Sequence, residues 1–391
     1  MCYGRGPETV RHFTIRNFWR VTIPDSIANV EAIRAVFPLV SPILLGQSTI
    51  AGRDFLCVRV TTEAGLHGHA FALSRELPSD AFIQQSVAPL LIGRDSDLIG
   101  ERMGECHAAL AAPSRVGMVK RALSLVEIAL WDVKGHRLDA PLWRLLGGAR
   151  SQVPVVMVGG YLTADTTPEA IGAKLGDLAS QGYRYLKIAR TPTPEQTRRV
   201  ITAARASMPP ECGLVVDTHW CWDTSADAIR ELDGWGSDLD LAWLEDPMPP
   251  EAWEPCRELR EQSGLTIGVG DEVTDEQVLR RLIDSRAIDV ARTDATTLGG
   301  IGAWSRMSAY AKLSGLTVSP HAYPEVHIHC ACAWPVACAV EMFEPDSPYW
   351  PTNQFISGGL RLEGGIAHAP EGPGLGVEFD WECIQHHDRN R

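Results

Sequence analysis

Seven short apolar stretches of this chain each end on one charged or ionisable side chain, and their order constrains the fold more than any other feature. The closing residues are Lys187, Asp217, Glu245, Asp271, Asp294, His321 and Glu341. They follow one another at intervals of 20 to 30 residues, the length of one β-strand and one α-helix. In a (β/α)8 barrel, the residue at the carboxyl end of each strand points into a shared site. The spacing therefore predicts such a barrel, with these side chains gathered at one end.

Length and composition suit a globular protein with more than one structural unit. The 391 residues exceed the roughly 250 of a barrel, and 45% hydrophobic with 22% charged residues is ordinary for a soluble chain. A net charge of −13 disfavours nucleic acid and anionic membranes as partners. No apolar run reaches about 20 residues, the N-terminus lacks a continuous hydrophobic segment, and the ten cysteines are irregularly spaced. We therefore expect a cytoplasmic protein with reduced thiols.

The pattern of apolar residues changes twice along the chain. Residues 1–148 predict a small α+β domain, with strands over 11–75, a hairpin turn at Glu63–Gly65, and helices after them. Residues 149–345 alternate between apolar runs and helical segments, which predicts the parallel barrel. We expect the last segment, 346–391, to return to the N-terminal domain, so that both ends of the chain build a cap on the barrel.

Three of the strand-end residues are acids that would point at one volume. Asp217, Glu245 and Asp271 lie at successive periods of the pattern. Three carboxylates at close range repel and need a cation to remain ionised together. A hard divalent ion, Mg²⁺ above all, suits such oxygen ligands. The sequence therefore predicts a magnesium site, with Glu272 next to Asp271 as an alternative third ligand.

The remaining strand-end residues suit proton transfer beside this metal. Lys187 lies one strand before the acids, where a nearby dication and partial burial would lower its pKa towards that of a usable base. Asp294 and His321 lie on the next two strands, and a carboxylate can fix the tautomer of an imidazole by binding its second nitrogen. Glu341, if protonated, could donate a hydrogen bond to a developing oxyanion.

Together these groups suit removal of the proton next to a carboxylate: Mg²⁺ holds the carboxylate, a base takes the α-proton, and Glu341 with the metal stabilises the enediolate. The chain resembles the mandelate racemase subgroup of the enolase superfamily. The resemblance rests on the segments ALWDVKG, VVDTHW, WLEDP, VGDE, RTDATTLGG, SPH and VEMFE, and it covers nearly the whole chain. It implies a modified, enolase-like (β/α)8 barrel under an α+β cap whose loops close over the substrate.

The resemblance also implies a role for each matching residue. Asp217, Glu245 and Asp271 match the metal ligands, Lys187 the second lysine of the Lys-x-Lys base motif, His321 and Asp294 the His–Asp dyad, and Glu341 the enolate-stabilising Glu. Two positions depart from the pattern. The first lysine of Lys-x-Lys is Tyr185, which argues against a simple mandelate-type racemase. His219, two residues after Asp217, resembles the Asp-x-His of certain sugar-acid dehydratases, where the His can protonate a departing hydroxyl.

We therefore expect a Mg²⁺-dependent dehydratase that converts a sugar acid, an aldonate or an aldarate, into a 2-keto-3-deoxy acid. Lys187 or His321 would remove the α-proton, and His321 or His219 would protonate the leaving hydroxyl. Tyr185 and Arg190 are candidate substrate contacts. The alternatives are a racemase or epimerase of a 2-hydroxy or 2-amino acid, and a non-catalytic binder of sugar acids. The family also suggests a homo-oligomer.

Overall fold

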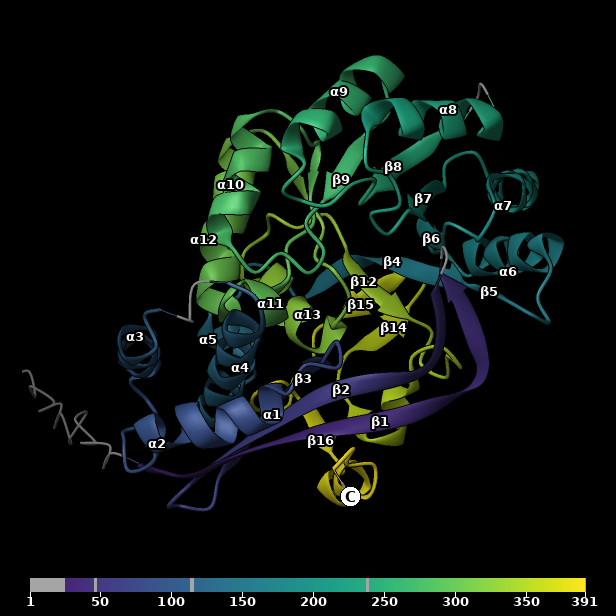
Figure 1. The fold of residues 1–391 in the computed structure, drawn as a ribbon. Helices are drawn as coiled ribbons and strands as arrows, with labels where there is room; N and C mark the ends of the chain where they lie inside the picture. The colour runs from purple at the N-terminus through teal and green to yellow at the C-terminus, as the bar shows by residue number, and fades with distance from the viewer. Residues whose placement is uncertain (1–24, 46–47, 113–115, 237–238, 391) are drawn as a thin grey trace, which may run out of the picture.

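The computed structural model describes residues 25–45, 48–112, 116–236 and 239–390, and its centre is a closed barrel of eight parallel strands (Figure 1). The barrel strands are β4 (Gln152–Gly160), β6 (Tyr185–Ala189), β7 (Gly213–Asp217), β8 (Leu241–Glu245), β9 (Ile267–Val269), β10 (Val290–Ala291), β11 (Thr317–Val318) and β12 (Val340–Phe343). From β4 to β11, each strand pairs with the next one in this order, and β12 pairs with β4. A bridge from Val318 to Ala337 closes the ring. The predicted barrel is confirmed.

Helices follow the first seven barrel strands and lie outside them (Figure 1). They are α6 (Pro168–Ser180), α7 (Pro194–Ser207), α8 (Ser225–Trp235), α9 (Trp253–Ser263), α10 (Glu276–Asp284), α11 (Ala295–Leu298) with α12 (Gly300–Leu313), and α13 (Pro324–Ala333). Side chains that accept an N–H of the first turn begin five of these helices, namely Thr167, Thr193, Thr224, Asp275 and Asp294. In the described part of the chain, a 3₁₀ turn (Pro351–Gln354) follows β12 where an eighth helix would stand. The barrel is thus the modified form that was predicted.

The N-terminal part is an antiparallel sheet packed on helices. Strands β1 (Ile27–Leu45), β2 (Ser48–Thr62) and β3 (His67–Leu73) form it, and the predicted hairpin joins β2 to β3. Its helical elements are α1 (Ser79–Phe82), a π-helix (Ile83–Val87), α2 (Ala88–Leu91), α3 (Ile99–Ala109), α4 (Met118–Leu138) and α5 (Leu142–Leu145). A Cβ on Gly68 would lie 2.2 Å from the Ala129 carbonyl oxygen, so only glycine lets β3 touch α4. The part of the predicted strand region before Asp25 lies outside the described residues.

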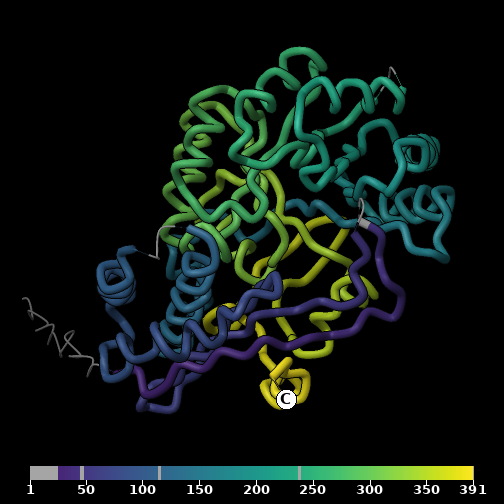
Figure 2. The backbone as a smooth tube through the Cα atoms, viewed as in Figure 1, coloured from purple at the N-terminus to yellow at the C-terminus, as the bar shows by residue number. Residues whose placement is uncertain are grey.

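The C-terminal segment runs back along the N-terminal sheet (Figure 2). It contains β13 (Ile356–Gly358) paired with β16 (Val377–Phe379), β14 (Arg361–Glu363) paired with β15 (Ile366–His368), and α14 (Trp381–His386). The Val36 N–H of β1 donates to the His387 carbonyl at 2.9 Å. The far end of β1 pairs with β5 (Leu162–Thr163), just after the first barrel strand, so the N-terminal sheet reaches the carboxyl end of the barrel strands. The domain boundaries at residues 148 and 345 stay a prediction.

No helix among the described residues combines the length and the apolar character that crossing a membrane requires.

Candidate active site

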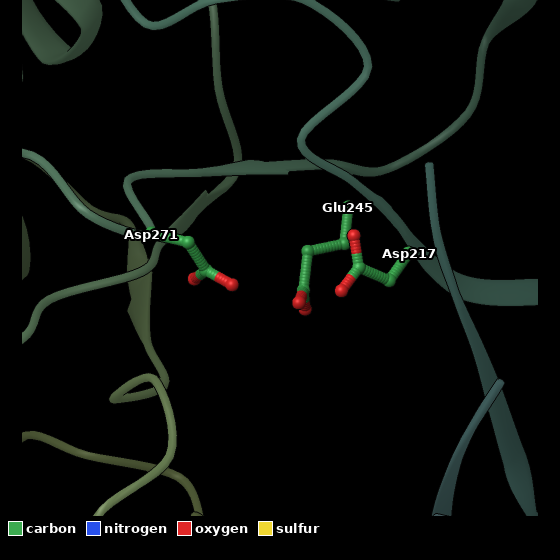
Figure 3. A group of neighbouring side chains, drawn as sticks. All are labelled: Asp217, Glu245 and Asp271. Carbon is green, nitrogen blue, oxygen red and sulfur yellow. The ribbon is translucent and has the colours of Figure 1, made fainter. Parts of the chain in front are cut away.

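The three predicted acids meet at the carboxyl end of the barrel. Asp217 and Glu245 are the last residues of β7 and β8, and Asp271 lies two residues beyond β9. One ligand oxygen from each lies within 4.8 Å of the others, and Figure 3 shows the three carboxylates turned towards a common space. Glu245 is fully buried, and the other two are nearly so. The sequence spacing thus placed all three correctly.

Two buried cations lie among these acids. The Lys187 Nζ lies 3.1 Å from Asp217 Oδ2 and 4.0 Å from Asp271 Oδ2, and it donates to Glu245. The Arg292 Nε lies 3.0 Å from Glu245 Oε2 and 3.1 Å from Asp271 Oδ1. Sequence reasoning missed Arg292, although the run VARTD carries it just before one of the predicted strand-end acids.

The charges of this cluster leave an excess of two negative charges. Glu341 contacts both Lys187 and Arg292, so four carboxylates face two cations when the neighbouring imidazole is neutral. One divalent ion would balance that excess. Carboxylate oxygens at this spacing are the donors that Mg²⁺ prefers. The residues present therefore fit a divalent metal, with Asp217, Glu245 and Asp271 as its protein ligands.

The two neighbouring acids after β9 point to different partners. Asp271 faces the carboxylate cluster, whereas Glu272 accepts hydrogen bonds from Arg75 at 2.5 Å and from Arg121. Burial opposes ionisation of Glu272, but these two guanidinium groups outweigh it and hold its pKa well below the usual range. Because Arg75 comes from the turn after β3 and Arg121 from helix α4, both in the N-terminal part, Glu272 ties the cap to the barrel. The geometry thus favours Asp271 over Glu272 as the third ligand.

His321 and Asp294 form a dyad at the edge of the same space. His321 Nδ1 lies 3.0 Å from Asp294 Oδ2, and His321 Nε2 lies 3.6 Å from Asp271 Oδ2. The other oxygen of Asp294 accepts from the N–H and hydroxyl of Thr296 at 2.7 Å, which fixes the carboxylate. Burial favours neutral imidazole, but Asp271 and Asp294 outweigh it and raise the pKa of His321 to about 9. A cation on Asp271 would compete for that charge, so the protonation of His321 depends on what the carboxylate cluster holds.

Lys187 lies in the middle of β6, not at its end as predicted. The strand continues to Ala189, which pairs with Asp217 across the ladder. Residues two apart on a strand share a face, so Tyr185 lies below Lys187 in the barrel interior. Its ring packs against Trp243 with the ring centroids 5.9 Å apart, in an apolar layer at the base of the barrel. Tyr185 is absent from the described lining of the cavity, which corrects its predicted role as a substrate contact.

Glu341 belongs to the cluster as an acceptor. Both of its oxygens lie 3.2 Å from Lys187 Nζ, and Arg292 donates to Oε2. This is the reverse of the donor role that the sequence predicted for Glu341. In this arrangement Glu341 holds Lys187 and Arg292 in place, and the cations are the available donors.

Of the two remaining predicted residues, one reaches the cavity and one does not. His219 lines the cavity, its N–H donates to Asp217 Oδ1 at 3.0 Å, and its ring packs on Trp220. Burial lowers the pKa of His219. Arg190 instead forms a two-bond pair with Glu231 of α8, at 2.7 and 2.9 Å. This pairing turns Arg190 away from the substrate space and corrects its predicted role.

A small cavity lies over the cluster and is lined by both the barrel and the N-terminal part. Its walls include four residues that the sequence analysis did not single out, namely Arg53 and Arg75 of the N-terminal part, Tyr161 after β4, and Trp350 after β12. No local pattern marks them. They reach the cavity through pairings such as that of β1 with β5, which join residues more than a hundred positions apart.

Comparison with known proteins places most of the chain in one family. The profile described as "Enolase C-terminal domain-like" matches residues 170–383, and "Mandelate racemase / muconate lactonizing enzyme, N-terminal domain" matches residues 28–147.

Two curated proteins and one solved structure illustrate the similarity. An L-talarate/galactarate dehydratase of Salmonella typhimurium (strain LT2) is 28% identical over 90% of this chain and 88% of its own length. A D-mannonate dehydratase of Sphingomonas sp. (strain SKA58) is 26% identical over 88% of this chain and 93% of its own. The structure of L-talarate dehydratase from Polaromonas sp. JS666, complexed with Mg and L-glucarate, has a TM-score of 0.81 at 24% identity, over 93% of this chain and 98% of that one. These matches confirm the predicted resemblance: the chain belongs to the mandelate racemase/muconate lactonizing enzyme family, with its enolase-like C-terminal domain.

Proposed function

We propose that the protein is a Mg²⁺-dependent dehydratase that eliminates water from a sugar acid, an aldonate or an aldarate, to give a 2-keto-3-deoxy acid. The observation that carries the proposal is the meeting of two groups over one cavity. The first group is the carboxylate cluster, in which one oxygen of each acid lies within 4.8 Å of the others. The second group is His321, whose Nε2 faces the cluster while its Nδ1 is hydrogen-bonded to Asp294. The talarate/galactarate and mannonate dehydratases among the relatives support the same reaction class.

The cluster suits the carboxylate end of such a substrate. Mg²⁺ on Asp217, Glu245 and Asp271 would neutralise the substrate carboxylate and stabilise the negative charge that develops as the α-proton leaves. Lys187, 3.2 Å from both oxygens of Glu341, adds a fixed ammonium donor on the same side. Because its Nζ is already engaged by several carboxylates, we assign Lys187 to binding and charge stabilisation and His321 to proton removal.

His321 is placed to move the protons of the elimination. Its Nε2 takes the proton from C2, the C2–H electron pair forms the C2–C3 double bond, and the C3–O bond breaks. The leaving hydroxyl takes a proton from the imidazolium of His321, or from His219 on the cavity wall, and departs as water. Asp294 keeps the imidazole in one orientation throughout. The enol product then tautomerises to the 2-keto-3-deoxy acid.

A substrate panel tests the proposal. Purified protein with Mg²⁺ is incubated with aldonates and aldarates, and the products are measured as semicarbazones of 2-keto acids. We expect keto acid from at least one compound, loss of the signal with EDTA, and loss with His321→Asn. Full turnover by His321→Asn would show the dyad assignment to be wrong.

A racemase or epimerase of a 2-hydroxy or 2-amino acid is the second candidate, because Lys187 of β6 and His321, in the loop after β11, both line the cavity. It requires exchange of the α-proton without formation of a keto acid. Proton NMR of the same incubations in D₂O separates the two reactions. Exchange alone supports the epimerase, keto acid supports the dehydratase, and tight binding with neither supports a non-catalytic sugar-acid binder.

A further inference from the structure

Arg53 is a buried cation on the cap side of the cavity. It lies on β2, is only 5% exposed, and lines the same cavity as Asp217 and His321. Its Nε donates to the Tyr349 carbonyl at 2.9 Å. Its guanidinium carbon lies 5.3 Å from the ring centre of Trp350 and 5.9 Å from that of Tyr161. These contacts fix the plane of the guanidinium group.

No carboxylate of the described residues forms an ion pair with Arg53. The other arginines near the cavity have such partners. Arg292 pairs with three acids of the cluster, and Arg75 and Arg121 share Glu272. Burial without a counter-ion is costly for a guanidinium group, which cannot lose its proton to relieve the cost. Arg53 therefore lacks an anion that its neighbours possess.

An anion bound to Arg53 would lie in the same cavity as the carboxylate cluster. The Tyr161 ring, whose centre lies 5.9 Å from the Arg53 guanidinium carbon, lines the same cavity as Lys187, Asp217 and Glu341. Arg53 comes from β2 of the N-terminal sheet and the carboxylate cluster from the barrel strands, yet both line one cavity. A molecule that fills the cavity would therefore contact the carboxylate cluster with one part and Arg53 with another.

We propose that Arg53 binds the second, distal carboxylate of a dicarboxylic sugar acid, so that the protein prefers aldarates to aldonates. The inference rests on the proposed function and narrows its substrate class. A hydroxyl at the distal end would leave the guanidinium charge without a counter-ion, whereas a carboxylate matches its planar fork with two hydrogen bonds. Arg75 cannot take this role while Glu272 holds it.

Matched pairs of substrates test the preference directly. The pairs are galactarate with galactonate, glucarate with gluconate, and mannarate with mannonate, which differ only at the distal carbon. We expect wild-type kcat/KM to be higher for the aldarate of the productive pair. In Arg53→Met the aldarate-to-aldonate ratio should fall about 10- to 100-fold, the usual worth of a hydrogen bond to a charged group. Arg53→Lys should restore part of that loss.

Arg59 offers a matched control on the same strand. It also lies over an aromatic ring, that of Trp381, but Glu31 already neutralises it and it is not part of the cavity wall. Arg59→Met should leave the substrate ratio at its wild-type value. An equal fall in this variant would overturn the assignment to Arg53, because it would show a general effect on the cap.

Calorimetry tests the role of Arg53 independently of the proposed dehydratase activity, because it measures binding without turnover. Binding of each acid is measured with Mg²⁺ to the His321→Asn protein, with and without Arg53→Met. Tighter binding of the aldarate that depends on Arg53 supports the inference even if no sugar acid is dehydrated. Faster dehydration of the aldonates overturns the inference and leaves the dehydratase intact. Tighter binding of a 6-phosphoaldonate than of the aldarate would overturn it too, because the distal site would then select phosphate.

Discussion

The barrel wall and the cap wall of the cavity carry opposite excess charges. On the barrel wall, four carboxylates surround Lys187 and Arg292, so negative charge is in excess. On the cap wall, Arg53 has aromatic rings and a carbonyl as neighbours, so positive charge is in excess. A molecule that is anionic at both ends, together with a dication, would balance both walls. In our proposal, the barrel residues carry out the reaction, and the cap selects the distal end of the substrate.

Two consecutive residues, Asp271 and Glu272, show the same contrast between barrel and cap. Asp271 belongs to the barrel cluster, and Glu272 is bound by two arginines of the cap. Substituting each acid in turn therefore separates loss of metal chemistry from loss of cap attachment.

The largest effect is expected from Asp271→Asn. Turnover should fall by more than about 1,000-fold, because charge stabilisation by a bound metal is worth several kcal/mol. EDTA should produce the same loss in the wild type, and added Mg²⁺ should reverse it. Calorimetric titration with Mg²⁺ checks the cause: affinity is lost in Asp271→Asn and kept in Glu272→Gln. The opposite result would make Glu272 the third ligand.

His321→Asn should lower kcat by about 100- to 10,000-fold, the usual contribution of a positioned acid or base. Mg²⁺ affinity should stay at the wild-type value, because His321 lies outside the set of three ligands. Asp294→Asn should have a smaller effect on kcat, since it alters the tautomer and orientation of the imidazole and leaves the ring in place. A variant without His321 that still exchanges the α-proton in D₂O would move proton removal to Lys187.

The sequence predicted the barrel side of this comparison far better than the cap side. Asp217, Glu245 and Asp271 recur with the strand-helix period, so local patterns alone could place them. Lys187 was also found, but β6 runs two residues past it. Tyr185 and Arg190 were misplaced because sequence spacing does not show which strand layer a side chain joins, nor that Glu231 of a later helix would pair with Arg190.

The cap side depended on contacts that no local pattern encodes. Arg53 looks like any surface-strand arginine in the sequence. Its burial follows from the pairing of β1 with β5 and from the return of the segment around Trp350. Arg292 differs, because it lies within the apolar run VARTD, and the pattern marks only the residue that closes each run, here Asp294. Long-range packing therefore decides the position of Arg53, whereas the local strand decides that of Arg292.

Glu272→Gln should mainly reduce stability. It leaves the buried Arg121 and the partly exposed Arg75 without their carboxylate. Breaking a fully buried pair costs about 3–5 kcal/mol, and we expect the lower end of that range because solvent reaches Arg75. Urea unfolding measures the change in the free energy of unfolding. Asp271→Asn is the control: it removes one of four crowded carboxylates and should destabilise the protein less. If Asp271→Asn proves the more destabilising of the two, Glu272 is not the tie between cap and barrel.

A smaller effect is expected where the cap helix α4 meets the barrel helix α12. Glu127 of α4 accepts the N–H groups of Ile301 at 2.5 Å and Gly302 at 3.2 Å, and burial, opposed by these two bonds, raises its pKa from 4.5 to about 7. Between those two pH values the folded protein binds more protons than the unfolded chain, so stability falls as pH rises. The whole effect is at most about 3.5 kcal/mol, because each pKa unit is worth about 1.4 kcal/mol.

The test for Glu127 compares the wild type with Glu127→Gln in urea unfolding from about pH 4 to about pH 8. The wild type should lose stability relative to the variant as pH rises through this window, and the difference should level off above the folded-state pKa. If the difference does not change with pH, the pKa of Glu127 is the same in the folded protein and in the unfolded chain. If stability instead rises with pH, the folded-state pKa lies below the unfolded value. The bonds to the start of α12 then outweigh burial, and charge holds this contact between cap and barrel as it does at Glu272.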